Sequence, residues 1–417
     1  MFDDELLAEV RARFHHVDEC PYQGPRAFFE NAGGSLTLRS VVERSTELLA
    51  LPDNQGRANP ASAALGELIT RGRADMMTMF GATSGLAIVG ETGTELLGRL
   101  IRSAVLAAEG GAVIGSHLEH PATYSACRRW AEVAGLPYHQ VPFDTATSVV
   151  GVDHYRPVLD EPVAVATIIH ASPVTGMHVD MAAIAAEIRR RSPEAFIIVD
   201  GIQHAAHGRI DVDTYGIDGY VLSGYKFFSR HNYGVAWLSD RLAEVPHDRL
   251  DGTDRRVWEL GTRDASAYAT FSEVIRYLEW LGERVDPDAA AVDSRAAIEA
   301  AASAIGGQER HLVATMLHGD ERLPGLARLD GVSVVGPVSS EHRSGMVSFV
   351  VDAMPSADVV AALSDDGVRA HVRKRDHYSS GILEPLGLDD CVRASVCHYN
   401  STAEVERLLA TVNRLVG

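Results

Sequence analysis

Short apolar runs alternate with longer helical patterns through the first two thirds of the chain, and this alternation most constrains the fold. Five runs have the length and composition of strands: residues 111–116, 163–170, 196–200, 220–223 and 233–239. Helical patterns such as residues 181–191 separate them. Because parallel strands need long crossovers, usually helices, the pattern predicts an α/β fold with a mostly parallel sheet covered on both faces. A ligand crevice is expected at the carboxyl ends of the strands.

The last third of the chain has a different pattern. It turns alanine-rich near residue 286, with helical or strand-like stretches at residues 288–303, 310–323, 332–335, 346–351 and 357–364 and a terminal helix from Thr402. Single hydrophobic cores stop growing near roughly 250–300 residues, which the chain exceeds. We therefore expect a large ligand-binding domain (26–285), a small C-terminal α+β domain (286–417), and an N-terminal helical segment (1–25) that packs on the small domain.

The net charge of −19 restricts the partners of this chain. Nucleic acids and anionic membranes carry the same sign of charge and are not expected as main partners. No segment approaches the ~18 consecutive apolar residues of a membrane span, and the acidic N-terminus does not resemble an export signal. The cysteines are Cys20, Cys127, Cys391 and Cys397. They lack the spacing of a zinc site or a disulfide framework, so we expect no metal and a cytoplasmic location.

Lysine is rare in this chain. Only Lys226 and Lys374 occur, and every other basic side chain apart from histidine is arginine. Arginine stays protonated at accessible pH, whereas a buried lysine amine can become neutral and attack an aldehyde. Lys374 lies in the basic cluster 373–375, where retention by chance is the simpler interpretation. Lys226 therefore becomes the candidate nucleophile.

Two strand ends carry further polar groups. The strand at residues 196–200 ends on Asp200, and Gln203 follows three residues later. The strand at residues 220–223 ends on Ser223 and runs into Lys226. A carboxylate at such an edge can keep a pyridine nitrogen protonated, which makes pyridoxal 5'-phosphate (PLP) an electron sink. A lone strand-end aspartate is more often a helix cap or a solvated turn, so the ordered pair of motifs carries this prediction.

These motifs resemble the class-V aminotransferase family of PLP enzymes of fold type I, which holds cysteine desulfurases, selenocysteine lyases, kynureninase and isopenicillin-N epimerase. The stretch 223–228 is similar to the Ser-x-Tyr-Lys-Phe-Phe motif of its cysteine desulfurase-like branch. The resemblance implies PLP as cofactor, bound by a seven-stranded, mostly parallel sheet. It assigns Lys226 as the Schiff-base lysine and proton shuttle, Asp200 as partner of the pyridine nitrogen, and Gln203 as partner of the phenolic oxygen.

The same resemblance assigns further cofactor contacts. Gly93 and Thr94 fall where the family keeps its phosphate loop, with Ser223 and Tyr225 as additional phosphate ligands. A helix start presents free N–H groups that suit a phosphate, although an ordinary capped helix has the same sequence pattern. Two more residues are assigned in this way, His120 to stack on the pyridine face and Thr262 to reach the phosphate of a neighbouring subunit. The resemblance thus implies a homodimer with active sites at the subunit interface.

Substrate contacts are implied at three positions. Arg393 matches the arginine that holds the substrate α-carboxylate, Asn31 lies in the matching N-terminal motif, and Tyr378 stands where desulfurases carry their nucleophilic cysteine. Usual persulfide chemistry is therefore not expected. Pro173 also replaces the family's asparagine near the phenolic oxygen. The basic pair at 373 and 375 fits either recognition of a second acidic group or a solvated charged loop.

We therefore expect a PLP enzyme that acts on a small amino acid. A lyase that eliminates a β or γ substituent, such as a C–S lyase, is the leading hypothesis because elimination needs no extra nucleophile. An aminotransferase or a Cα epimerase on the same scaffold is the alternative. A non-catalytic PLP-fold protein should lack Lys226 or Asp200, and both are present. A dinucleotide site would need a Gly-x-Gly-x-x-Gly turn, which the sequence does not contain.

Overall fold

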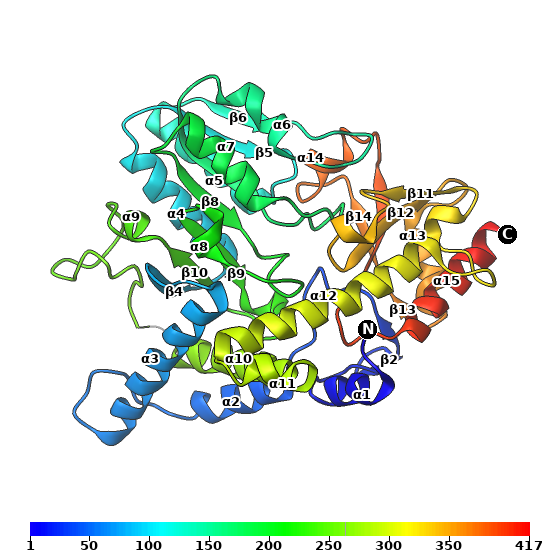
Figure 1. Ribbon diagram of the computed structural model, residues 1–417, viewed down its shortest axis with the longest axis horizontal. Helices are drawn as coiled ribbons and strands as arrows, with labels where there is room; N and C mark the ends of the chain where they lie inside the picture. Colours follow the sequence, from blue (N-terminus) through cyan, green and yellow to red (C-terminus); the bar gives the residue numbers. More distant parts are fainter. Residues whose placement is uncertain (263) are drawn as a thin grey trace.

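A seven-stranded mixed sheet forms the centre of the protein, described here by a computed structural model of residues 1–262 and 264–417 (Figure 1). Its strand order is β4-β10-β9-β8-β7-β5-β6. The strands are β4 (Leu86–Gly90), β5 (Ala112–Ser116), β6 (Tyr138–Val141), β7 (Val163–Ile169), β8 (Phe196–Asp200), β9 (Gly219–Ser223) and β10 (Gly234–Leu238). Neighbours from β6 to β9 pair in parallel, and β10 is antiparallel to both β4 and β9. The predicted α/β fold with a mostly parallel sheet is confirmed.

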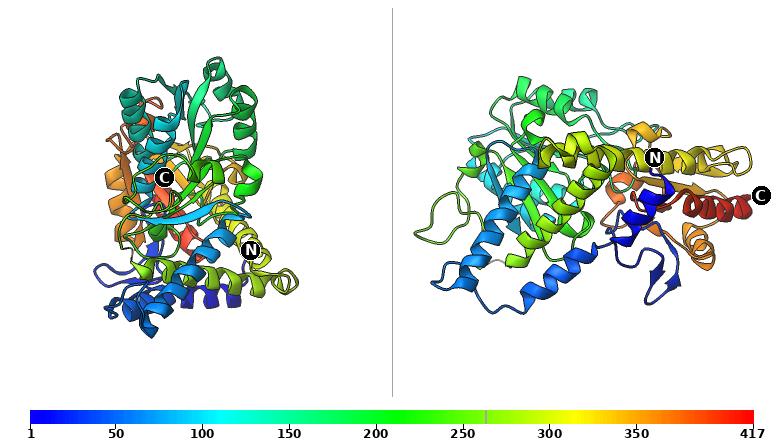
Figure 2. Two further views of the ribbon diagram at one scale, coloured as in Figure 1. Left: turned by 90° about the vertical axis from the view of Figure 1, so that its left-hand side faces the viewer. Right: turned by 60° about the horizontal axis from the view of Figure 1, so that its bottom comes forward.

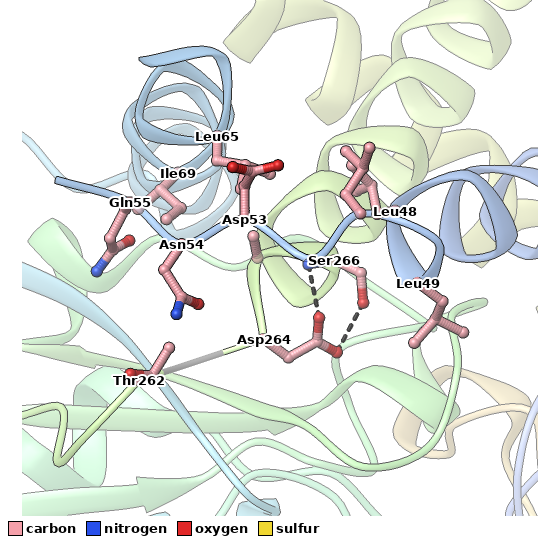
Figure 3. A pocket seen from close by; sticks show the side chains of 12 residues that line it. Leu48, Leu49, Asp53, Asn54, Gln55, Leu65, Ile69, Thr262, Asp264 and Ser266 are labelled. Atoms are coloured by element: carbon pink, nitrogen blue, oxygen red, sulfur yellow. Dashed lines mark hydrogen bonds between the residues drawn. The ribbon is translucent and has the colours of Figure 1, made fainter. Parts of the chain in front are cut away.

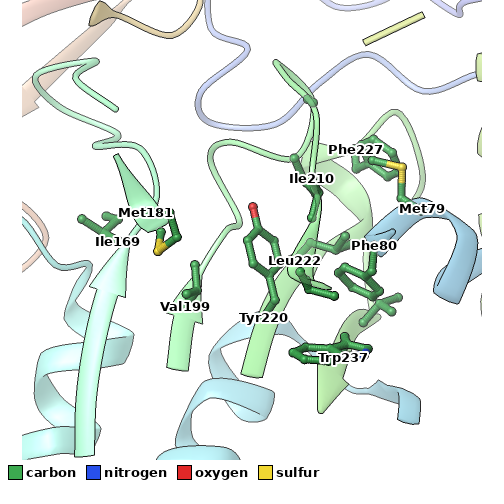
Figure 4. Packing of buried hydrophobic residues seen from close by; sticks show 14 of the residues in the cluster. Met79, Phe80, Ile169, Met181, Val199, Ile210, Tyr220, Leu222, Phe227 and Trp237 are labelled. Atoms are coloured by element: carbon green, nitrogen blue, oxygen red, sulfur yellow. The ribbon is translucent and has the colours of Figure 1, made fainter. Parts of the chain in front are cut away.

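Helices cover both faces of this sheet, so its central strands are buried on both sides. The helices α4 (Gly93–Ala107) and α5 (Pro121–Ala134) pack on one face, where Ile198 and Val221 meet Leu97 of α4. The other face is covered by α3 (Pro60–Phe80), α7 (Met181–Arg191) and α10 (Ala265–Val285). Figure 4 shows side chains of α3 packed against those of β9 and β10 on this second face. Near-continuous apolar strands are what such double coverage requires.

A second, antiparallel sheet follows in the order β11-β12-β15-β14. It consists of β11 (Val332–Val335), β12 (Met346–Val351), β14 (His371–Lys374) and β15 (Asp390–Ser395). The helices α12 (Ser294–His318), α13 (Ser356–Asp365) and α15 (Thr402–Val416) share a separate apolar core with it. Figure 2 shows α15 at the end of the molecule opposite α3. A distinct core is why this part of the chain folds beside the large sheet rather than into it.

The N-terminal segment joins the two parts. Its helix α1 (Asp4–Ala12) is followed by Phe14, which packs against Tyr277 of α10 and against Tyr399. Arg11 donates a hydrogen bond to the Tyr399 carbonyl at 2.6 Å. Farther along, β3 (Ala27–Phe28) pairs in parallel with β13 (Val368–Arg369). The division into units at 1–25, 26–285 and 286–417 stays a prediction.

Several shorter elements complete the described chain. They are α2 (Arg39–Leu49), β1 (Glu19–Cys20), β2 (Gly24–Pro25), α6 (Val152–Tyr155), α8 (Val212–Tyr215), α9 (Asp240–Ala243), α11 (Pro287–Ala290), α14 (Ser380–Leu383) and the 3-10 turns η1 (Arg156–Leu159), η2 (Gly224–Lys226), η3 (Leu326–Arg328) and η4 (Ser340–His342). Among the described helices, none combines the length and apolarity that a membrane crossing requires.

One predicted boundary is wrong. The sequence pattern suggested two helices at 288–303 and 310–323, whereas α12 is continuous from Ser294 to His318. Two glycines at 306 and 307 weaken the helix interior because they lack a side chain. The helix continues through them because Ile305, Gly306 and Gln308 are buried against the rest of the protein, and tertiary packing supplies most of the stability of such a helix.

Candidate active site

A cavity of about 150 Å³ opens at the carboxyl edge of the large sheet. Strands β7, β8 and β9 end beside it, and α4 begins beside it. It is lined by Thr92, Gly93, Thr94, His120, Ile169, Pro173, Asp200, Ile202, Gln203, Ser223, Tyr225 and Lys226. Most of the residues assigned to the cofactor from the sequence therefore meet in one cavity, because parallel strands end at one edge.

Lys226 lies on the turn η2 that follows β9. Its Nζ donates a hydrogen bond to Oε1 of Gln203 at 3.3 Å. Burial is the main cause that lowers the pKa of Lys226 to about 8; the charge of Arg393 lowers it further and Asp200 opposes the shift. A substantial fraction of this amine is therefore neutral near physiological pH, which an exposed lysine would not be.

Asp200 ends β8 and is buried at the cavity wall. One of its oxygens accepts from the Ile202 N–H at 3.1 Å and the other from Thr123 Oγ1 at 3.2 Å. Burial raises the pKa of Asp200, and the nearby cation of Lys226 opposes that rise. The donors and the cation oppose the effect of burial and so favour the carboxylate form of Asp200.

A second buried carboxyl, Glu119, lies close to Asp200. Its Oε1 accepts from the Ile169 N–H at 2.9 Å and from Ser116 Oγ at 3.1 Å, while its Oε2 has no partner among the described residues. Burial, followed by the charge of Asp200, raises the pKa of Glu119 to about 8. Each of the two carboxyls accepts from two donors, but the charge of Lys226 also lowers the pKa of Asp200, so Glu119 holds the proton and the anionic form is favoured at Asp200.

The start of α4 forms the other end of the cavity. Thr92 caps the helix by accepting from the Glu95 N–H at 3.0 Å, and Gly93 is its first residue. A Cβ on Gly93 would lie 2.5 Å from Ser223 Oγ, and one on Gly234 would lie 2.6 Å from the Gly93 nitrogen. These close approaches place a serine hydroxyl and backbone N–H groups together, which is the donor set of an anion site.

Two aromatic residues lie at the cavity entrance. His120 precedes α5, and its Nδ1 accepts from the Ala122 N–H at 3.2 Å. Burial, then the charges of Lys226 and Arg373, lowers the pKa of His120 to about 4, so the ring is neutral at physiological pH. Tyr378 is 48% exposed and its ring centroid is 6.0 Å from that of His120. Tyr378 is thus close to a lining residue but does not itself line the cavity.

Arg393 lies behind the cavity wall on β15. It is only 3% exposed, and its Nη1 donates to the carbonyl of Pro173, a lining residue, at 2.9 Å. Its Nε has no partner among the described residues. Burial, then the charge of Arg373, lowers the pKa of Arg393 to about 9. A buried guanidinium with unused donors beside the cavity is suited to bind an anion.

Asn31 does not line the cavity. Its Nδ2 donates to the carbonyl of Ser395 at 2.8 Å, and Tyr399 donates to its Oδ1. This buried amide therefore fixes the N-terminal segment against the end of β15. The substrate contact expected of Asn31 stays a prediction.

Thr262 lies in a different pocket, which shares no lining residue with the cavity of Lys226. Figure 3 shows Thr262 beneath Asn54, in a hollow bordered by Leu48 and Leu49 at the end of α2. Leu49 is 76% exposed. Within one chain, Thr262 is therefore away from the cavity of Lys226. This position is compatible with a residue that contacts the cavity of a neighbouring subunit.

Sequence reasoning missed several residues of the site. Thr123 and Ile202 carry no motif, and Glu119, which stands directly before His120 in the motif that assigned that histidine, received no role of its own. The contribution of all three depends on tertiary neighbours. The available signal for Thr123 was its place as the third residue of α5, shortly after His120. Elsewhere, His207, Glu309 and Cys397 each bring one potential metal-ligand atom within 4.8 Å of the others, although the spacing of the cysteines suggested no metal site. His207 and Glu309 already hydrogen bond each other at 2.8 Å.

The family model described as "Aminotransferase class-V" matches residues 27–408. The chain belongs to the class-V aminotransferase family. The resemblance inferred from the sequence motifs is thereby confirmed.

Curated relatives of this class-V protein match along the full length. A probable cysteine desulfurase 2 of Mycobacterium leprae is 29% identical over 98% of this chain and 96% of its own. A probable cysteine desulfurase of Vibrio cholerae is 23% identical over 98% of both chains. Among solved structures, the apo cysteine desulfurase of Thermococcus onnurineus NA1 superposes with a TM-score of 0.82 at 21% identity, covering 100% of this chain and 98% of that one. That structure confirms the fold of the class-V protein.

Proposed function

We propose that this class-V protein binds PLP in the cavity at the sheet edge, covalently through Lys226, and acts on an amino acid. One observation carries the proposal: Lys226 is a half-buried lysine whose pKa lies near 8, beside a buried carboxylate and a polar amide. A lysine in that state is rare, and it is the state that reaction with an aldehyde requires.

The donor set of the cavity fits each part of PLP. The start of α4 with Ser223 would hold the phosphate, Asp200 the protonated pyridine nitrogen, and Gln203 the phenolic oxygen. The neutral ring of His120 would cover the pyridine face. The cramped contacts of Gly93 and Gly234 support this assignment, because side chains there would fill the phosphate end.

When bound, PLP supplies an electron sink for the electrons released at the substrate Cα. Residues of this chain provide the remaining functions. Arg393 binds the α-carboxylate through its free donors and so orients the Cα–H bond. The Lys226 amine takes and returns the proton at Cα, for which a pKa near 8 is well suited. Asp200, left charged because Glu119 holds the proton, keeps the ring nitrogen protonated.

For the reaction type we propose elimination of a β or γ substituent, as in a C–S lyase. The full-length relatives that are named cysteine desulfurases support C–S bond chemistry. A protein-bound thiol nucleophile at the mouth is not part of the proposal. Tyr378 occupies that place, and Cys391 and Cys397 are both buried. Elimination needs only proton transfer by Lys226 and departure of the leaving group, so it requires no such nucleophile.

Product analysis distinguishes the three reactions of this scaffold. The loaded protein is incubated with amino acids that carry β or γ leaving groups, and products are followed by mass spectrometry and chiral chromatography. Elimination gives ammonia, a 2-oxo acid and the free leaving group. A 2-oxo acid formed only with an amino acceptor, or inversion at Cα with no other change, would replace elimination with amino transfer or epimerisation.

Complete inactivity with every amino acid would favour the non-catalytic alternative. Exchange of the Cα proton with solvent deuterium is the control, since it reports Lys226 chemistry that all three reactions share. We expect exchange in the wild-type protein and none in Lys226→Ala.

We also propose a homodimer in which Thr262 of one chain reaches the phosphate end of the other. The separate pocket around Thr262 and the exposed Leu49 and Leu51 beside it support this arrangement. A cytoplasmic location is proposed as well, and the four free cysteines support it.

A further inference from the structure

A second arginine faces the same region as Arg393. In the antiparallel pair of β14 and β15, His371 is opposite Arg393 and Arg373 is opposite Cys391. Residues two apart on a strand share a face, so Arg373 and Arg393 are diagonal neighbours on one side of the sheet. Such neighbours are roughly 7–8 Å apart, within the combined reach of two long side chains. The side chain between them, Cys391, is buried.

Arg373 differs from the basic residues beside it. Arg375 forms an ion pair with Asp389 at 2.5 Å, and Lys374 is exposed. The half-buried Arg373 forms no ion pair within 4.0 Å among the described residues and donates instead to Ser379. Its Nε is buried without a partner. A half-buried guanidinium that donates to a neutral hydroxyl and keeps an unused N–H retains capacity for an anion.

The charge of Arg373 acts on the active site. It lowers the pKa of Lys226, His120 and Arg393, after burial in each case. Burial lowers the pKa of Arg373 itself, and the negative charge of Asp376 opposes this by raising it. Arg373 is therefore electrostatically part of the site although it does not line the cavity.

The carboxyls near these arginines are already engaged. Glu30 accepts from Arg369 at 2.8 Å and pairs with His371 at 3.2 Å. Asp200 faces the cofactor end, and Glu119 holds a proton. One substrate carboxylate would match Arg393 and leave Arg373 with only the charge of Asp376 nearby, to which it makes no ion pair within 4.0 Å among the described residues. In a chain of net charge −19, this local excess of positive charge at the site calls for another anion.

We propose that Arg373 binds a second acidic group of the substrate, so that the preferred substrates are α-amino acids with an anionic side chain. This inference rests on the proposed function and specifies its substrate class. Arg393 holds the α-carboxylate and Arg373 holds the distal acid. A neutral side chain leaves the Arg373 guanidinium desolvated and unpaired, which disfavours that substrate.

Binding of acids without an amino group tests the proposal, because such compounds cannot react. The PLP-loaded protein is titrated by calorimetry with succinate against butyrate, and with glutarate against pentanoate. Each pair has equal chain length and differs in one carboxylate. We expect the dicarboxylates to bind roughly 10- to 100-fold more tightly, the range for a hydrogen-bonded charge pair. This comparison uses only the wild-type protein, so it does not depend on folding of a variant.

Variants then assign the effect to one residue. Arg373→Gln should reduce the affinity for succinate to that for butyrate and leave butyrate binding unchanged. Arg373→Lys should retain part of the preference. The matched control Arg375→Gln should change neither affinity, because Arg375 is exposed and paired with Asp389. Replacing one carboxylate of succinate by sulfonate or phosphonate identifies the oxyanion that Arg373 prefers.

Two results would overturn the inference. Equal affinities for succinate and butyrate in protein with a verified cofactor adduct on Lys226 would reject the substrate class while the proposed cofactor chemistry stands. A preference for succinate that Arg373→Gln leaves intact would show that another group binds the second acid. Absence of any adduct on Lys226 would instead remove the proposed function, and the inference with it.

Discussion

Lys226 Nζ donates to Oε1 of Gln203 across 3.3 Å at the carboxyl edge of the sheet. The amide oxygen stabilises the protonated amine without adding a charge, so burial still lowers the pKa of Lys226 to about 8. Reaction of cofactor-free protein with PLP should therefore speed up as pH rises from 6 to 9, because only the neutral amine attacks the aldehyde. Stopped-flow absorbance should give a midpoint near pH 8. A rate that keeps rising beyond pH 10 would indicate an exposed lysine.

Gln203→Glu should move that midpoint upward. A carboxylate at this distance favours the protonated amine and raises a lysine pKa by roughly one to three units. Reconstitution at pH 7 should be about 10-fold slower or more, with the maximal rate at high pH little changed. The uncharged control Gln203→Ala should shift the midpoint slightly down. An unchanged midpoint in Gln203→Glu would mean that the two side chains do not interact in solution.

Asp200→Asn should abolish most catalysis while the fold is retained. Asparagine keeps an oxygen that accepts from the Thr123 hydroxyl but loses the charge that protonates the ring nitrogen. The rate of Cα deuterium exchange, followed by NMR, should fall roughly 100- to 1000-fold, as for loss of a preorganised electrostatic contact. Cofactor occupancy, measured from absorbance, is the control for binding. Exchange within a few-fold of wild type at full occupancy would contradict the assigned role.

Glu119 should make the protein sensitive to alkali. Its pKa is raised from 4.5 to about 8, so it binds its proton more tightly in the folded state. That stabilisation is fully present below about pH 4.5 and is lost as pH rises through about 8. Glu119→Gln should thus be more stable than wild type at pH 9, by roughly 1–4 kcal/mol in urea unfolding, and similar at pH 6. The exposed control Glu321→Gln should have the same pH dependence of stability as wild type. If the carboxyl of Glu119 were ionised throughout, Glu119→Gln would also show no pH-dependent difference from wild type.

Thr262 offers a test of the homodimer. Thr262→Ala should bind PLP about 10-fold more weakly, since a hydrogen bond to a phosphate is lost. Mixing it with inactive Lys226→Ala should restore activity if Thr262 acts across the interface. One of the two sites in each mixed dimer then combines an intact Lys226 with an intact Thr262. Mixing under conditions that exchange subunits, checked by native mass spectrometry, would yield no gain if Thr262 served its own chain.

The sequence predicted the parts of the site that depend on the order of strands. Asp200, Ser223 and Lys226 follow strands that were recognisable as apolar runs, and parallel strands bring their ends to one edge. Gln203 and Gly93 could be placed by family motifs on the same edge. The central sheet could also be predicted from the sequence, because strands covered on both faces are continuously apolar.

The rest depends on tertiary neighbours that a linear pattern does not encode. Glu119 holds its proton because of burial beside Asp200, and Thr123 reaches that aspartate from a helix. Arg373 and Arg375 look equivalent in sequence. The strand β14 ends at Lys374, so Arg373 is held on the sheet beside Arg393, while Arg375 lies beyond the strand and pairs with Asp389. The hydrogen bonds that Asn31 makes with Ser395 and Tyr399 likewise join segments far apart in the sequence.

Covalent attachment of PLP to Lys226 is the central claim, and peptide mass spectrometry after borohydride reduction tests it most directly. Protein incubated with PLP should be yellow, lose that absorbance on reduction, and carry one stable pyridoxyl group on Lys226. Lys374→Ala, which removes the only other lysine, should behave like wild type, while Lys226→Ala should carry no adduct. A protein that stays colourless with PLP, or an adduct confined to Lys374, would contradict the account.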